Sequence, residues 1–313
     1  MNGPIKNVAV VGGSGNLGQH IVRELLHAGF TVTVLKRSST SSTTSTTTTF
    51  PGDVQTREIA DYTSIPSLTA ALEGQDAVVC TISTGASIAG VQKPLVDAAV
   101  AAGVRRFVPS EFGINTRFLE DGPIKRILGG KLETLGYLHE MHKREKEKGR
   151  SFTWTGISTG LFFDWGLDFG SIGVAKSSRT ATIYDSGDEP FQATNLRTIG
   201  RAVAAVLRQP ERTVNRYLTI ASFNPTKNEI HATIERLTGE KWQVHRASTA
   251  EHYQIGLDKL DKGDYMAFSH FLRHRIHRDG AGLAVTGPDN ALDLLGIEEE
   301  SLEDTLREWL GRE

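Results

Sequence analysis

The sequence predicts an α/β protein built on a Rossmann-type, doubly wound parallel sheet, and two observations carry that prediction. Short apolar runs alternate with helical patterns up to about residue 157, which is typical of parallel strands joined by right-handed helical crossovers. The first apolar run ends directly in a glycine-rich turn that opens a helix, as in a β-α-β unit. A chain of 313 residues is also long enough to add a smaller second part to this sheet.

The expected elements follow in chain order from their apolar spacing. We expect strands over residues 8–11, 31–35, 55–60, 76–82, 106–109 and 152–157, and helices over residues 17–26, 64–72, 92–102 and 131–148. After Gly160 the pattern loosens, and helices are expected over residues 198–207, 227–237 and 301–310, with a small helical cap over 239–282. Every residue from 38 to 49 is Ser or Thr, and such a tract predicts a mobile surface loop.

Composition and charge argue against several classes of partner. Lys+Arg is 35 and Asp+Glu is 37, so a chain with a formal charge of −2 has no global attraction for nucleic acid or an anionic membrane. The first apolar run is far shorter than the roughly 20 residues of a membrane span. The single cysteine, Cys80, forms no internal disulfide and no cysteine-based zinc site. We therefore expect a cytoplasmic protein, as a monomer or a homodimer, without nucleic-acid or membrane partners.

The turn after the first strand carries glycine at positions 12, 15 and 18. Glycine lets the backbone approach a pyrophosphate, and the helix N-terminus that follows supplies free N–H groups and the positive end of its dipole. A glycine pattern alone is weak, but here it follows a strand and opens a helix, as the motif requires. The residues expected to contact a dinucleotide are Gly12, Ser14, Gly15, Asn16, Leu17 and Gly18.

The end of the second strand indicates which dinucleotide binds. NAD-binding proteins usually carry an acidic residue there for the ribose 2′-hydroxyl, whereas this chain has Lys36, Arg37 and Ser38. Two cations and a hydroxyl suit a 2′-phosphate, which arginine can bind with two hydrogen bonds. The sequence therefore favours NADP(H). Asp61 and Tyr62, after the third strand, either touch the adenine edge or form a plain turn.

Residues that follow the other strands are placed by the geometry of the fold, because ligands bind outside the carboxyl ends of parallel strands. The cofactor-binding residues expected on this ground are Thr81, Ser83, Thr84, Ser110, Gly160 and Leu161. Four aromatic residues in the same loops are candidates to line an aromatic substrate pocket, although each is by type more often a core residue: Phe112, Phe162, Phe163 and Trp165.

The glycine spacing, the Lys36-Arg37 pair and the string Pro109-Ser110-Glu111-Phe112-Gly113 together resemble the NmrA-like and isoflavone reductase-like branch of atypical short-chain dehydrogenases. Residues 152–155 and 159–167 are similar to the fungal members in particular. The similarity runs from about Ile5 to Leu310. It implies an NADP(H)-binding Rossmann domain over residues 1–158 and a smaller, mainly substrate-binding α/β domain over residues 159–313, some of whose segments return to the Rossmann sheet.

The resemblance also implies a catalytic lysine. No tyrosine of this chain is followed four residues later by lysine, so the Tyr-x-x-x-Lys pair of the main short-chain dehydrogenases is absent. Isoflavone reductase-like enzymes instead place a lysine at the start of the helix after the P-S-E-F-G string, and Lys131, with Tyr137-Leu138 following it, fits that position. A lysine there can protonate a carbonyl or enolate oxygen or hydrogen-bond the nicotinamide ribose. Because the segment between residues 113 and 130 is irregular, Lys125 is the alternative.

His270, His274 and His277 share helical spacing, but Arg273 and Arg275 interleave them and no carboxylate stands at a matching offset. A basic helix at a surface or pocket rim is the better interpretation, and no metal site is expected.

Two functions from different classes remain. The first is an NADPH-dependent oxidoreductase that reduces a C=C, C=N or C=O group of a small aromatic or polycyclic natural product in secondary metabolism, with a cyclisation added to or replacing the reduction. The second is a non-catalytic, NmrA-like regulator that senses dinucleotides and binds a transcription factor. The retained Lys131 and the aromatic run from Phe162 to Trp165 favour the enzyme, although a Rossmann fold guarantees binding and not chemistry.

Overall fold

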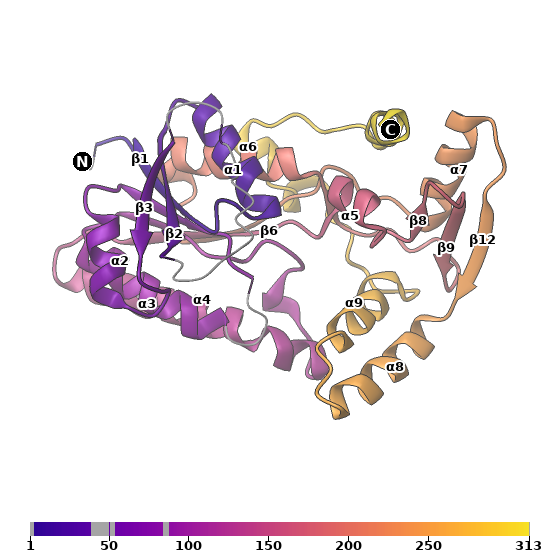
Figure 1. Cartoon of the computed structure of the whole chain (residues 1–313), viewed down its shortest axis with the longest axis horizontal. Helices are drawn as coiled ribbons and strands as arrows, with labels where there is room; N and C mark the ends of the chain where they lie inside the picture. Colours follow the sequence, from indigo (N-terminus) through magenta and orange to yellow (C-terminus); the bar gives the residue numbers. More distant parts are fainter. Residues whose placement is uncertain (1–2, 39–49, 51–53, 84–87, 313) are drawn as a thin grey trace.

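A seven-stranded parallel sheet forms the centre of the computed structural model, which describes residues 3–38, 50, 54–83 and 88–312 (Figure 1). The strand order is β11-β6-β5-β4-β1-β2-β3, and each neighbouring pair is parallel. The strands are β1 (Asn7–Val11), β2 (Thr31–Arg37), β3 (Gln55–Ile59), β4 (Ala77–Cys80), β5 (Arg106–Val108), β6 (Thr153–Ser158) and β11 (Arg216–Thr219). The order reverses between β1 and β4, which is where a doubly wound sheet opens a crevice for a ligand.

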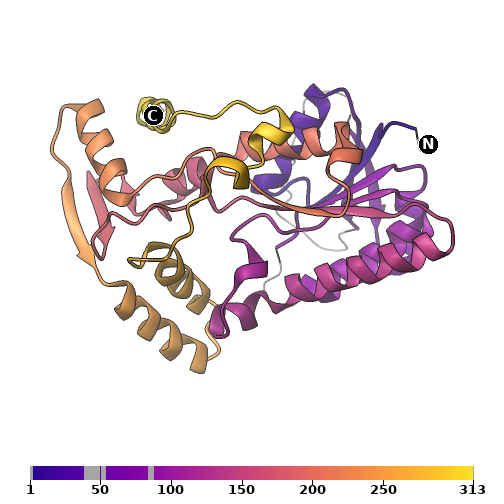
Figure 2. The same ribbon diagram turned by 180° about the vertical axis from the view of Figure 1, so that it is seen from behind.

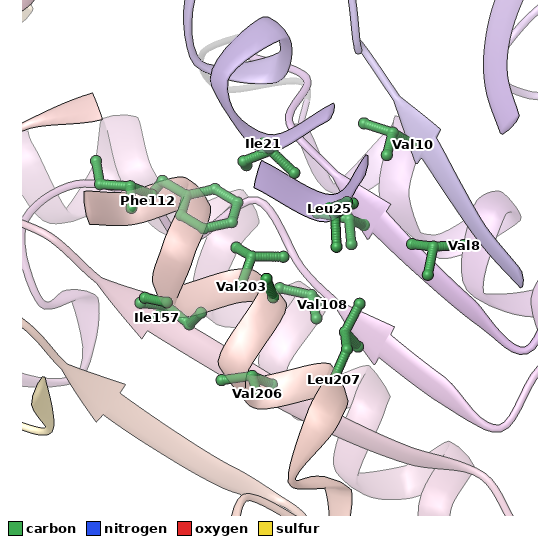
Figure 3. Packing of buried hydrophobic residues seen from close by; sticks show 14 of the residues in the cluster. Val8, Val10, Ile21, Leu25, Val108, Phe112, Ile157, Val203, Val206 and Leu207 are labelled. Carbon is green, nitrogen blue, oxygen red and sulfur yellow. The ribbon is translucent and has the colours of Figure 1, made fainter. Parts of the chain in front are cut away.

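Helices cover both faces of the sheet because successive strand residues point to opposite sides. Val8 and Val10 pack against α1 (Asn16–His27) and α6 (Leu196–Arg208), and Figure 3 shows these valines with Ile21, Leu25 and Val203. Ala9 and Val11 belong to the core of the other face, which is covered by α2 (Ile65–Leu72), α3 (Ile88–Ala101) and α4 (Pro123–Glu147). The long α4 then reaches the second part of the molecule, where it contacts α9, which spans Ala267–His277 (Figure 2).

The second part combines two small sheets with helices around a separate core. One sheet pairs β7 (Leu161–Phe162) with β10 (Ala193–Thr194), and the other has the order β12-β9-β8, with β8 (Val174–Ala175), β9 (Thr180–Tyr184) and β12 (Gln243–Ala247). The helices of this part are α5 (Phe163–Phe169), α7 (Lys227–Thr238), α8 (Thr249–Asp261), α9 (Ala267–His277) and α11 (Leu302–Gly311). Helix α10 (Leu292–Leu295) instead packs with α6 in the core of the large sheet. The short 3-10 helices are η2 (Thr116–Phe118), η3 (Pro210–Arg212) and η4 (Gly287–Asp289).

The six strands and four helices expected for the sheet are present, and three differences stand out. The helix expected from residue 131 begins at Pro123, because proline is favoured in the first turn of a helix, so Lys131 lies more than two turns inside α4. The segment expected as a purely helical cap also contains β12, which forms by pairing with β9. A further strand, β11, returns from the C-terminal half to pair with β6.

None of the described helices combines the length and the apolar character that crossing a bilayer requires.

Candidate active site

The glycine turn after β1 forms a cradle in which side chains would collide with the backbone. Gly12 has φ +85°, and a Cβ there would lie 2.7 Å from Thr81 Oγ1. A Cβ at Gly18 would collide with the carbonyl oxygen of Gly12, so the start of α1 packs directly on the turn. Gly15 caps α1 without a side-chain hydrogen bond, while Ser14, Gly15 and Asn16 are exposed and Leu17 and Gly18 are buried. The first N–H groups of α1 therefore face solvent over a surface of bare backbone, which fits an anionic pyrophosphate.

The end of β2 presents the predicted cations to solvent. Lys36, Arg37 and Ser38 are exposed, and the Arg37 guanidinium lies 5.2 Å from the centre of the Tyr62 ring. Asp61 caps its own turn by accepting hydrogen bonds from the N–H groups of Thr63 and Ser64, so it is a turn residue. An exposed arginine held over an aromatic ring at this strand end fits a 2′-phosphate next to an adenine.

Polar side chains join the carboxyl ends of the central strands. The Thr81 N–H and hydroxyl groups both donate to the carbonyl oxygen of Val11, at 2.8 and 3.0 Å, linking β4 to β1. The buried Ser110 hydroxyl donates to the carbonyl oxygen of Ile82 at 2.7 Å, linking the end of β5 to that of β4. Ser83 is exposed beside them, and Thr84 lies outside the described residues.

Lys131 reaches this edge of the sheet from α4. A Cβ built on Gly113 would lie 3.9 Å from Lys131 Nζ and 3.8 Å from the carbonyl oxygen of Glu111, so the amine lies over the segment that follows β5. Burial lowers the pKa of Lys131, and the negative charge of Glu111 opposes that shift. Burial raises the pKa of the nearby Cys80 thiol to about 12, so that side chain stays neutral near pH 7. Lys125, the alternative, forms an exposed ion pair with Asp121 at 2.7 Å in the first turn of α4. The structure therefore brings Lys131, and not Lys125, to the strand ends.

Glu111 is a site residue that sequence reasoning missed, although it stands between Ser110 and Phe112 in the P-S-E-F-G string. Its side chain is fully buried, and its Oε2 accepts hydrogen bonds from the hydroxyls of Thr116, at 2.6 Å, and Tyr217, at 2.8 Å. Burial and the nearby Glu111 carboxylate raise the pKa of Tyr217. A carboxylate after a strand of an α/β sheet is the signal that could have identified it.

The loop after β6 is tied to the same segment by backbone hydrogen bonds. The N–H groups of Thr159 and Gly160 both donate to the carbonyl oxygen of Gly113, at 2.9 and 3.0 Å. Gly160 has φ +62°, and a Cβ there would collide with the carbonyl oxygen of Gln192. Leu161 donates its N–H to that same oxygen at 3.0 Å and packs against the core of the second part.

The four aromatic candidates differ in exposure. Phe163 is fully buried, with its ring edge against Phe223, and Phe112 packs in the core with Ile157 (Figure 3). Phe162 and Trp165 are partly exposed, and the Trp165 ring stacks on Phe169 with ring centres 4.7 Å apart. Core packing thus occupies two of the candidates, and the other two keep surface for a ligand.

A cavity of about 420 Å³ opens where the edge strand β11 meets η2 and α9. Its lining includes Arg117, Gly160, Tyr217 and Arg275, but neither Lys131 nor any of the four aromatic candidates. Tyr217 separates this cavity from the buried Glu111, because its ring lines the cavity while its hydroxyl binds the carboxylate.

The three histidines of α9 differ in their contacts and burial. His270 Nδ1 lies 2.8 Å from His252 Nδ1, His274 Nδ1 lies 3.1 Å from the carbonyl oxygen of Thr249, and His277 is only 3% exposed. The expectation of a basic surface helix is wrong for His277, because its ring stacks on Tyr184 inside the second part. Within the described ranges, no three His, Cys, Asp or Glu side chains are gathered closely enough to hold a metal ion.

Comparison with known proteins supplies independent information. The model of the NmrA-like family matches residues 4–273. Among curated proteins, oxidoreductase poxI of Penicillium oxalicum is 33% identical over 301 residues, covering 95% of this chain and 91% of its own length. Oxidoreductase aprR of Aspergillus flavus is 34% identical over 268 residues, covering 85% of this chain and 86% of its own. The solved structure of AtPrR2 with NADP⁺ and (+)-pinoresinol superposes with a TM-score of 0.73 at 22% identity, over 99% of this chain and 100% of that one.

These matches test three of the sequence predictions. The resemblance inferred from the sequence motifs is confirmed by the family match, and the parallel sheet together with the likeness to AtPrR2 confirms the Rossmann-type fold. The prediction of an oxidoreductase is confirmed at the level of enzyme class, since the curated relatives that cover most of the chain are named oxidoreductases.

Proposed function

We propose that this chain, which belongs to the NmrA-like family, is an NADPH-dependent reductase of a small aromatic or polycyclic compound in secondary metabolism. The observation that carries the proposal is the approach of the Lys131 amine to the segment after β5, at the edge of the sheet where the glycine turn and Arg37 also lie. Its relatives named oxidoreductases support the class of reaction. The solved relative that holds (+)-pinoresinol, an aromatic compound, supports the class of substrate.

The described residues fit NADP(H). The bare backbone at Gly12 and Gly18 and the open N-terminus of α1 suit the pyrophosphate, and Lys36, Arg37 and Ser38 suit the 2′-phosphate. Thr81 and Ser110 border the space above the strand ends, together with Ser83 and Gly160. Bound NADPH would supply a hydride to a C=C, C=N or C=O group of the substrate.

Lys131 is the proposed catalytic residue. As an ammonium group it donates a hydrogen bond or a proton to the oxygen or nitrogen that gains negative charge during reduction. Partial burial strengthens this interaction because it removes competing water. Phe162 and Trp165, whose rings are partly exposed, are the proposed contacts for an aromatic substrate, and residues 159–313 provide most of the substrate-binding part.

Calorimetric titration with NADPH, NADP⁺, NADH and NAD⁺ tests the cofactor assignment. We expect the phosphorylated pair to bind at least about tenfold more tightly, because a charge-assisted contact contributes roughly 1.5–3 kcal/mol. Arg37→Ala removes most of that preference, whereas Arg23→Ala, which changes an exposed arginine on α1, leaves it unchanged. Equal affinity for all four nucleotides would contradict the assignment of the 2′-phosphate site.

Consumption of NADPH with a panel of aromatic enones, imines, ketones and lignans tests the reaction. We expect at least one class to be reduced by the wild-type protein and not by Lys131→Ala. Tight NADPH binding without turnover of any class would overturn the reductase and favour the dinucleotide-sensing regulator instead.

A further inference from the structure

A fully buried carboxylate without an ion pair of its own belongs to the segment that the Lys131 amine approaches. Glu111 is 0% exposed, and no lysine, arginine or histidine of the described residues lies within ion-pairing distance of it. Two hydroxyl groups donate to Oε2, while Oε1 has no hydrogen-bond partner among the described atoms. Burying a carboxylate in this way costs several kcal/mol unless a positive charge nearby offsets the loss of water.

The nearest candidate for that charge is the Lys131 amine. A Cβ at Gly113 would lie within 4 Å of both Lys131 Nζ and the carbonyl oxygen of Glu111, so the two residues border the same short stretch of backbone. The Arg117 guanidinium lies over the Tyr217 ring, 4.2 Å from its centre, and forms no ion pair with Glu111.

Several other charged groups around α4 have partners of their own. On the side of α3, Lys93 pairs with Glu133 at 3.1 Å, and Tyr137 donates to Asp97 at 2.5 Å. On the side of α9, Arg275 and Arg278 pair with Glu120, each at 3.2 Å. Glu111 is the carboxylate that raises the pKa of Lys131 against the effect of burial, and it belongs to the segment that the amine approaches.

We propose that Glu111 is a positioning residue that holds Lys131 in its protonated form at the strand ends. The hydroxyls of Thr116 and Tyr217 fix the carboxylate in place, and the carboxylate in turn stabilises the ammonium group against its burial. Lys131 then meets a substrate as an acid and not as a base. This inference rests on the proposed function for the role of Lys131, but the charge relation between the two residues can be measured without any substrate.

Competitive acetylation of the folded protein measures that relation. Acetic anhydride labels only neutral amines, and peptide mass spectrometry gives the labelling of Lys131 relative to the exposed Lys146 at each pH. In Glu111→Gln the midpoint of Lys131 labelling is expected at a pH about one unit lower, so that labelling at pH 7.5 rises roughly tenfold. The amide keeps an acceptor for Thr116 and Tyr217, so the change removes charge and little else.

Glu133→Gln is the matched control, because it neutralises a carboxylate two residues from Lys131 whose partner is Lys93. We expect it to leave the midpoint of Lys131 unchanged. Glu111→Asp keeps the charge and is expected to restore most of the wild-type midpoint. An unchanged midpoint in folded Glu111→Gln, or an equal fall in Glu133→Gln, would overturn the proposal.

Two further readouts keep the inference separate from the proposed function. If Glu111→Gln does not fold, Tyr217→Phe is the second variant. It removes one donor to the carboxylate and leaves more of its negative charge to act on Lys131, so the midpoint of Lys131 labelling should move to higher pH; no shift overturns the proposal. In turnover assays, Glu111→Gln should move the alkaline limb of the kcat profile to lower pH with little change in KM. A shifted labelling midpoint together with full turnover in Lys131→Ala would refute the catalytic role and leave the charge relation intact.

Discussion

Burial lowers the pKa of two lysines of this protein, but the groups around them differ. Lys131 lies at the strand ends, where the Glu111 carboxylate opposes the effect of burial on its pKa. Lys227, the first residue of α7, is 4% exposed, and no carboxylate of the described residues lies within ion-pairing distance of it. Its amine donates to the carbonyl oxygen of Ile172 and lies over the rings of Tyr184 and Phe191, at 5.4 and 5.6 Å. Burial and the charge of Arg273 lower the pKa of Lys227 to about 7.

The difference shows that a lowered lysine pKa does not by itself identify a catalytic site. Lys227 sits in a packed group in which His277 stacks on Tyr184 with ring centres 5.1 Å apart, and burial holds the pKa of His277 well below its usual value. That group is closed by aromatic rings, whereas Lys131 is partly exposed at the edge where parallel strands end. Access and a neighbouring carboxylate are what distinguish the amine proposed to work as an acid.

Replacing each lysine by methionine gives the largest expected contrast. Lys131→Met should lower kcat about 10²–10⁴-fold, because it removes the group that donates to the developing charge. Lys227→Met should leave kcat within about threefold of wild type, since its amine donates to a backbone carbonyl in the second part. Stopped assays of NADPH oxidation measure both, with calorimetric NADPH affinity as the control for folding. Comparable losses of kcat in the two variants would break the contrast.

The pH dependence of stability should distinguish the lysines next. The pKa of Lys227 is about 7 in the folded protein, below the value of about 10.4 for an unfolded chain. Between those two pH values the unfolded chain binds more protons, so the free energy of unfolding rises with pH, by at most about 1.4 kcal/mol per unit. Urea unfolding from pH 7 to 10 should show this rise in wild type and a flatter dependence in Lys227→Met. An unchanged slope in that variant would mean that Lys227 stays charged when buried.

Local patterns explain why most of the sheet could be predicted from the sequence. The strands β1 and β4 are continuous apolar runs, so their burial on both faces is visible in the residues themselves. The strands β11 and β12 read R-Y-L-T and Q-V-H-R-A, mostly polar and with a single buried residue between them, and they are strands because they pair with β6 and β9. Pairing across more than 60 residues leaves little signal in a short polar segment.

The candidate site likewise contains some residues that local sequence patterns predict and others that they do not. The glycine turn and Arg37 follow from the β-α-β motif, in which a few adjacent residues determine the geometry. Glu111 could not be identified from spacing, because its role depends on Tyr217, which is 106 residues away along the chain. The burial of Lys227 and Phe163 could not be predicted from local sequence either, since it depends on contacts that form only when the second part packs.

The smallest expected effect is a rise in the pKa of Lys227, opposite in sign to the fall expected for Lys131 in Glu111→Gln. Arg273 lowers the pKa of Lys227, so Arg273→Gln should raise that pKa from about 7 by less than about one unit. The rise of stability with pH would then begin at a higher pH, and the protein would gain some stability near pH 7. Arg278→Gln, on the turn that follows α9 and paired with Glu120 at 3.2 Å, is the control and should leave the onset in place. Urea unfolding between pH 6 and 10 measures the pH at which this rise begins. Removing the cation Arg273 should raise the pKa of Lys227, whereas removing the carboxylate Glu111 should lower the pKa of Lys131. A rise that begins at a lower pH in Arg273→Gln would therefore show that neighbouring charge does not govern the pKa of these buried amines.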